Sequence, residues 1–222
     1  LVLVMALSGF FFMFREDLAV EGREAKNALK TLHVWIGYAF AANLLVRVIW
    51  GFAGNHFARW RQILPNPRTL CEIGPDLRAM KARAPHAYLG HSPLGRVAIT
   101  AIFALLMTMA ASGLIRAGTD LYYPPFGPFV AAFVAEPGVD PARITWQTER
   151  ALTNDYRFGY INKVKWVASF AHTYGAYVLL LLIVAHVTGA ILTETQQNSG
   201  AISAMFSGRK MLSVRPLDAD SP

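Results

Sequence analysis

The sequence predicts an all-α fold, a transmembrane four-helix bundle made by a single integral-membrane domain that covers residues 1–222. Of the 222 residues, 54% are hydrophobic and only 16% are charged, which is too apolar for a soluble domain of this size. Four apolar stretches alternate with polar loops, and they cover residues 1–14, 32–53, 95–115 and 166–193. The last three are long enough to cross a hydrocarbon core of roughly 30 Å as helices.

The first apolar stretch, residues 1–14, is too short to span a bilayer alone, since fourteen helical residues rise only about 21 Å. It begins with Leu1 and lacks the charged start and the cleavage site of a signal peptide. We therefore expect the second half of a spanning helix that is truncated at its start, its first half preceding residue 1. Residues 15–31 are expected to form a short charged loop.

The charges of the loops predict the orientation in the membrane. Loop 55–94 is strongly basic and holds Arg59, Arg61, Arg68, Arg78, Lys81 and Arg83. By the positive-inside rule this loop is cytoplasmic. Loop 116–164 then lies on the opposite side, which would be the periplasm in a bacterium, whose inner membrane the chain would cross several times. This topology also accounts for the net charge of +7, and we find no nucleic-acid motif. The prolines of the basic loop make a long continuous helix unexpected there.

The last apolar stretch carries His172 and His186, which are 14 residues apart. On a helix they share nearly one face and lie about 21 Å apart along the axis, at two membrane depths. Histidine within a membrane is costly unless it faces a cavity, a partner or a cofactor, and haem iron fits best. Gly175 and Gly189 each follow a histidine by three residues, as if a flat ring needed clearance there. The alternative is ordinary packing glycines and histidines satisfied by neighbouring helices.

The stretch 32–53 repeats this spacing. Gly37 and Gly51 are 14 residues apart, and Arg47 follows His33 by the same interval, which places it one layer deeper on the same face. An arginine at that depth needs a partner, and a haem propionate would supply a carboxylate. The alternative is that Arg47 extends its guanidinium to the headgroup layer.

The topology then pairs the histidines by depth. His33 and His172 both lie near the periplasmic side, so these two can ligate one haem. His186 lies deeper, without a histidine partner at that depth in the given chain, and a histidine upstream of Leu1 is the expected donor. The single cysteine, Cys71, excludes covalent c-type attachment, so the haems are held non-covalently.

Four segments, LHVWIGYAFAANLLVRVIWGF, GHSPLGR, HTYGAYVLLLLIVAHVTG and SGRK, resemble in this order the bacterial cytochrome b561 family. That family includes the b-type cytochrome subunit of membrane-bound nickel–iron hydrogenases. The resemblance implies a four-helix bundle with two b haems, ligated from the first, second and fourth helices. It further implies electron transfer between a periplasmic redox partner and the quinone pool. His56 receives no ligand role from it.

The expected partners follow from the two faces. A nickel–iron hydrogenase or a multihaem cytochrome c would dock on loop 116–164, which is rich in aromatic residues and is expected to be ordered. Its candidate contacts are Tyr122, Tyr123, Phe126, Phe129, Trp146 and Tyr156. The alternative is that this loop is only a lid over the outer haem. Quinone would exchange with the inner haem near the cytoplasmic surface, where His91 and the basic loop could support proton transfer.

Two other functions compete with this interpretation. One is a haem-dependent reductase, ferric or ascorbate-type, that works at one surface of the membrane. The other is a helical bundle without haem that uses its histidines structurally. A reduced-minus-oxidised spectrum distinguishes the last from the other two, since only a b haem gives the α band.

Overall fold

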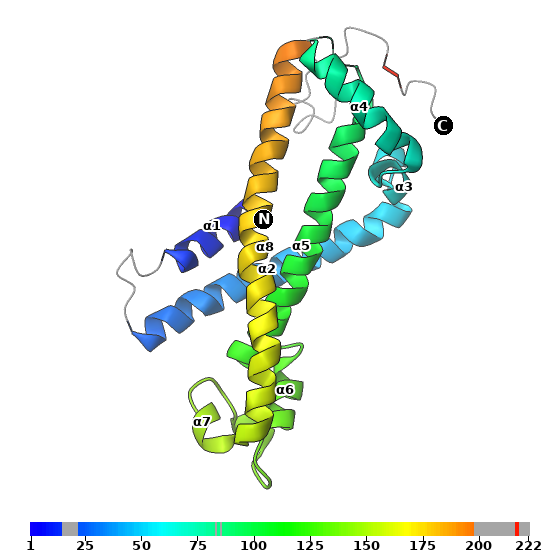
Figure 1. The fold of residues 1–222 in the computed structure, drawn as a ribbon. Helices are drawn as coiled ribbons and strands as arrows, with labels where there is room; N and C mark the ends of the chain where they lie inside the picture. Colours follow the sequence, from blue (N-terminus) through cyan, green and yellow to red (C-terminus); the bar gives the residue numbers. More distant parts are fainter. Residues whose placement is uncertain (15–21, 83, 85, 198–215, 218–222) are drawn as a thin grey trace. The chain divides into compact units, whose positions relative to one another are not determined.

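A computed structural model of the chain describes residues 1–14, 22–82, 84, 86–197 and 216–217 (Figure 1). Apart from one isolated backbone bridge between Ala135 and Thr153, these ranges hold helices and turns only. Three helices are long and apolar enough to cross a membrane, and they are α2 (Arg23–Ala53), α5 (Pro93–Asp120) and α8 (Asp155–Gln197). A shorter apolar helix, α1, covers Val2–Met13. The all-α class and the membrane-spanning character predicted from the sequence are confirmed.

The long helices extend beyond the apolar stretches that predicted them. Helix α2 begins at Arg23, so the expectation of a loop over residues 15–31 was wrong for its described part, and α8 begins at Asp155. These ends are polar because water can solvate them outside the hydrocarbon layer. Glu24 and Asp155 lie in the first turns, where a carboxylate interacts favourably with the helix dipole.

Backbone contacts divide the chain into two compact units, and α2, α5 and α8 each contribute a segment to both. The first unit comprises residues 1–46 and 106–177, and the second comprises residues 47–105 and 178–222. His33 and His172 belong to the first unit, whereas Arg47 and His186 belong to the second.

The first unit contains the loop region after α5, which is ordered as expected. It forms α6 (Gly127–Val134), a 3-10 turn at Pro141–Arg143, and α7 (Glu149–Leu152). A small apolar core holds it together, made of Val130, Ala131, Val134, Ala135 and Ile144. The backbone N–H of Asn154 donates to the Val134 carbonyl at 2.8 Å, which fixes the end of α6 beside the start of α8.

The second unit contains the basic loop, folded as a 3-10 turn (His56–Ala58), α3 (Trp60–Ile63) and α4 (Pro67–Lys81). The prolines were expected to make a long continuous helix unlikely here, and the described part of the loop forms three separate helical segments, of which α4 is the longest at 15 residues. Pro67 occupies the first turn, where no N–H is needed, and Asn66 and Thr69 form a capping box. Pro75 lies inside the helix and removes one backbone hydrogen bond.

Arg96 on α5 ties the basic loop to the helix. Its Nε donates to the Gln62 carbonyl at 2.7 Å, and its Nη1 donates to the Thr69 hydroxyl at 3.2 Å. The SGRK segment of the sequence resemblance, residues 207–210, lies outside the described residues.

Candidate haem site

The structure brings His33 of α2 and His172 of α8 together within the first unit. Their ring centroids are 6.2 Å apart and their planes are perpendicular, at 90°. A metal–nitrogen bond is about 2 Å, and a five-membered ring places each atom about 1 Å from its centroid. Two imidazoles on one iron therefore have centroids about 6 Å apart, which is the separation found here.

A hydroxyl group holds each of these rings on its Nδ1 side. Ser8 Oγ of α1 lies 2.9 Å from His33 Nδ1, and Ser112 Oγ of α5 lies 3.1 Å from His172 Nδ1. Both of these serine contacts are made at Nδ1, and neither involves Nε2. Each ring is thus satisfied at one nitrogen and retains the other for a ligand.

The donor set distinguishes haem from a bare metal ion. A structural or catalytic zinc ion takes at least three protein ligands. Among the described residues, no group of three or more His, Cys, Asp or Glu side chains could hold a metal. Haem iron requires only two axial ligands from the protein, because the porphyrin supplies the others. The residues present therefore fit a bis-histidine haem.

Two glycines that were not among the predicted ones lie against the histidine pair. A Cβ atom on Gly113 would lie 3.1 Å from His172 Cε1, and one on Gly9 would lie 3.5 Å from His33 Cε1. A Cβ added at Gly37, which was expected to give clearance, would lie 3.4 Å from Met5 Cε, and Gly175 is buried. Each close glycine directly follows a histidine-bound serine, a repeated Ser–Gly pair within apolar runs that could have been noticed in the sequence.

The second unit holds the remaining expected residues. His186 lies on α8, half-exposed, with no hydrogen bond or ion pair to another described residue. A Cβ on Gly189 would meet nothing within 4 Å, so space is open there. Gly51 is different, because the Trp60 indole occupies the space beside it. A Cβ added at Gly51 would lie 2.2 Å from Trp60 Nε1. The guanidinium of Arg47 lies 5.4 Å from the same indole ring, and its Nη1 is buried without a hydrogen-bond partner in the described part.

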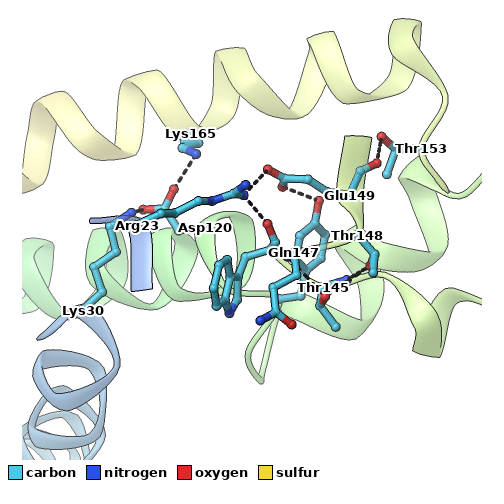
Figure 2. A network of polar contacts seen from close by, with 11 residues as sticks. Arg23, Lys30, Asp120, Thr145, Gln147, Thr148, Glu149, Thr153 and Lys165 are labelled. Atoms are coloured by element: carbon cyan, nitrogen blue, oxygen red, sulfur yellow. Dashed lines mark hydrogen bonds and ion pairs between the residues drawn. The ribbon is translucent and has the colours of Figure 1, made fainter. Parts of the chain in front are cut away.

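A charged cluster lies in the first unit around Asp120, whose side chain is only 7% exposed. Lys165 Nζ lies 2.5 Å from its Oδ1, and Lys30 Nζ lies 3.8 Å from its Oδ2 (Figure 2). Arg116 Nη2 lies 3.6 Å from the same Oδ2. The three cations come from α8, α5 and α2, and they outnumber the carboxylate by two formal charges. Arg116 Nε is also buried without a hydrogen-bond partner among the described residues. The sequence reasoning missed Arg116 because it assigned residue 116 to a loop.

Helix register places this cluster next to the histidine pair. Lys30 precedes His33 by three residues, and Arg116 follows the histidine-bound Ser112 by four, so each pair is one turn apart on one face. Lys165 precedes His172 by seven residues, which is two turns. Beside the cluster opens a polar cavity of about 440 Å³.

A second polar network joins the start of α2 to the region after α5 (Figure 2). Arg23 donates to the Trp146 carbonyl and lies 3.8 Å from Glu149. The Tyr122 hydroxyl donates to Glu149 at 3.2 Å. Burial, together with the negative charge of Glu149, raises the pKa of Tyr122 above its usual range. Tyr122 therefore remains a donor throughout the physiological pH range.

Four aromatic side chains form an exposed patch on α6 and the start of α8, here called the aromatic patch, and they are Phe129, Phe133, Tyr156 and Tyr160. The rings of Phe133 and Tyr160 are 6.1 Å apart, so the two helices present one continuous surface. Phe129 is 75% exposed and Tyr156 is 88% exposed. Phe126, another expected contact, is also exposed, whereas Tyr122 packs against the apolar core.

A family model described as prokaryotic cytochrome b561 matches residues 1–208. The chain is 26% identical to the probable Ni/Fe-hydrogenase B-type cytochrome subunit of Azotobacter vinelandii, over 82% of this chain and 68% of that protein. Subunits of the same description from Rhizobium leguminosarum bv. viciae (26% identical, 96% of this chain, 83% of that protein) and Cupriavidus necator (24%, 93% and 78%) are also similar. No solved structure gives a significant match. The chain therefore belongs to the prokaryotic cytochrome b561 family.

Proposed function

We propose that this protein is a dihaem b-type cytochrome of the bacterial inner membrane that passes electrons between a periplasmic redox partner and the quinone pool. The observation that carries the proposal is the His33–His172 pair, whose ring separation of 6.2 Å suits two axial ligands of one iron. Bound haem would supply the one-electron change between ferrous and ferric iron. The side chains around the pair then decide how that haem is held.

The charged cluster supports the same assignment. Arg116 and Lys165 both lie within ion-pair distance of the single carboxylate of Asp120, so positive charge exceeds negative charge in this cluster. A surplus of positive charge beside a membrane span is costly unless an anion offsets it. Arg116, with a buried and unpartnered Nε, is the cation best placed to hold a propionate of the His33–His172 haem.

The second haem of the proposal takes His186 and a histidine upstream of Leu1. Arg47, with its buried and unpartnered Nη1, would hold a propionate of this haem. Open space at Gly189 supports a flat ring at that face of α8. The position of Gly51 does not support a haem there, because the Trp60 indole occupies the space beside this glycine.

The proposed partners follow from the predicted topology and from the names of the relatives. The curated relatives are subunits of nickel–iron hydrogenases by their names, and a periplasmic hydrogenase is the partner we propose for this chain. It would dock on the aromatic patch, with a multihaem cytochrome c as the other candidate. Quinone would exchange with the His186 haem on the cytoplasmic side, near His91 and the basic loop.

Haem content of the purified full-length protein tests the proposal. A pyridine haemochrome assay is expected to give two b haems per chain. His33→Ala and His172→Ala should each remove the same haem, identified by redox titration, and His186→Ala should remove the other. A matched control is His56→Ala, which carries no ligand role and should retain both. Wild-type protein without haem, or loss of one centre in both the His33 and His186 variants, would contradict the proposal.

A further inference from the structure

The two histidines of the pair are held in the same way by two unrelated parts of the chain. Ser8 and Gly9 on α1 contact His33, while Ser112 and Gly113 on α5 contact His172. In each case the serine lies at Nδ1 and the glycine lies against Cε1. A Ser–Gly pair therefore supplies one hydrogen-bond partner and one flat surface to each ring.

The hydrogen bonds of the serines decide which ring nitrogen carries the proton. Ser8 Oγ donates to the Met5 carbonyl at 2.9 Å, and Ser112 Oγ donates to the Thr108 carbonyl at 2.7 Å. A hydroxyl has one proton, so each serine that donates to a carbonyl can only accept from the imidazole. Nδ1 of each ring is then the N–H donor, and Nε2 carries the lone pair.

We infer that Ser8 and Ser112 are positioning residues that fix both histidines in the tautomer that ligates haem iron through Nε2, each assisted by its adjacent glycine. This inference rests on the proposed haem ligation by His33 and His172. A hydrogen bond accepted from Nδ1–H also makes the imidazole a stronger electron donor to the metal, which favours ferric iron. The serines therefore lower the midpoint potential of this haem as well as orienting its ligands.

The glycines are predicted to differ in importance. A Cβ at Gly113 would lie 3.1 Å from His172 Cε1, too close unless the ring moves, whereas a Cβ at Gly9 would make an ordinary contact at 3.5 Å with His33. Gly113→Ala should therefore perturb the haem spectrum more strongly than Gly9→Ala does.

The experiment compares Ser8→Ala, Ser112→Ala and the conservative Ser112→Thr in full-length protein. Haem content, the midpoint potential and the low-spin electron paramagnetic resonance signal of the His33–His172 haem are measured. Both alanine variants should raise the midpoint potential and broaden the electron paramagnetic resonance signal. Ser112→Thr keeps the hydroxyl and should therefore show the wild-type potential and signal. Thr119→Val is the matched control, because Thr119 is a buried α5 residue whose hydroxyl donates to the Ile115 backbone carbonyl at 3.0 Å.

The outcomes separate this inference from the proposed function. If His33→Ala and His172→Ala retain the haem, the ligation itself is wrong. If those variants lose it while both serine-to-alanine variants keep the wild-type potential and signal, only the positioning role is wrong. Loss of the haem in Ser112→Ala with recovery in Ser112→Thr would support the role of the hydroxyl. Loss in both would instead indicate helix packing and overturn the inference.

Discussion

Lys165 and Asp120 form the closest ion pair of the charged cluster, with Nζ 2.5 Å from Oδ1. This contact joins α8 to α5, and Asp120 also binds Lys30 of α2, so one carboxylate connects three helices. The carboxylate is nearly buried, whereas its cationic partners are partly exposed. Removing its charge leaves three cations facing one another.

Asp120→Asn should therefore destabilise the protein by about 1–3 kcal/mol, between the values typical of exposed and of buried ion pairs. It should also raise the midpoint potential of the His33–His172 haem, because a nearby negative charge is lost. Thermal unfolding in detergent and redox titration measure the two effects. Asp140→Asn is the matched control, since Asp140 is exposed and asparagine can still cap the Ala142 amide. Equal stability of the two variants would contradict the role of the cluster.

Arg47→Gln tests the cation of the second unit. If Arg47 holds a propionate of the His186 haem, the potential of that haem should fall, because a nearby positive charge favours reduced iron. The potential of the other haem should not change. If neither potential moves, the guanidinium serves its contact with the Trp60 ring instead.

Gly189 and Gly51 form a matched pair for the clearance hypothesis. The protein itself leaves open space at Gly189, so Gly189→Leu should fold normally and lose haem only if a haem lies there. Gly51→Ala should instead destabilise the chain by about 1–3 kcal/mol, because its Cβ would overlap the Trp60 indole. Haem content and thermal unfolding distinguish the two. Full haem content in Gly189→Leu would remove that glycine from the site.

Docking on the aromatic patch is tested by Phe129→Glu and Tyr156→Ser. Both side chains are mostly exposed, so the fold and the haem spectra should be retained, while electron exchange with the periplasmic partner falls at least tenfold. Quinol-driven haem reduction should be unaffected. Phe57→Ser, an exposed aromatic of the basic loop, is the control. Loss of the His33–His172 haem would support a lid, and unchanged exchange would place the docking surface elsewhere.

Tyr122→Phe removes the hydroxyl that donates to Glu149 and should cost about 1 kcal/mol. The pKa of Tyr122 is raised by folding, so this residue contributes stability fully below the pKa of an unfolded tyrosine, about 10. The contribution declines as pH rises through the higher folded pKa. Thermal unfolding of both proteins from pH 6 to 11 should show a constant difference up to about pH 9 and a smaller one above. A difference that varies within pH 6–8 would contradict this assignment.

The sequence predicted the helices well because apolar length is a strong signal for membrane spans. It also predicted that His33 and His172 lie together, since depth and loop charge place them at one side. It failed at the helix ends, because the charged residues 23–31 predict a loop whereas α2 already begins at Arg23 and extends beyond the apolar stretch. The prolines of the basic loop also show that position decides the effect of a proline on helix stability. Pro67 lies in the first turn of α4, where no N–H is needed, whereas Pro75 lies inside the helix and removes one hydrogen bond.

The residues that surround the histidines could not be predicted from spacing alone. Ser8 and Ser112 are single hydroxyls in apolar runs, and only the tertiary structure shows that each faces an imidazole. Asp120 gains its importance from cations on three helices, which no local pattern reveals. Gly51 had the expected spacing but faces Trp60, so equal spacing did not mean an equal environment.

Helix α6 has a buried face that packs in the apolar core and an exposed face that carries aromatic side chains. Val130, Ala131 and Val134 are buried and hold the region after α5 together, while Phe129 and Phe133 point outward. Substitutions on the outer face leave the apolar core untouched. If the external partner docks on this outer face, as proposed, related proteins could exchange one partner for another by changing a single short helix, while the scaffold around the histidines is preserved.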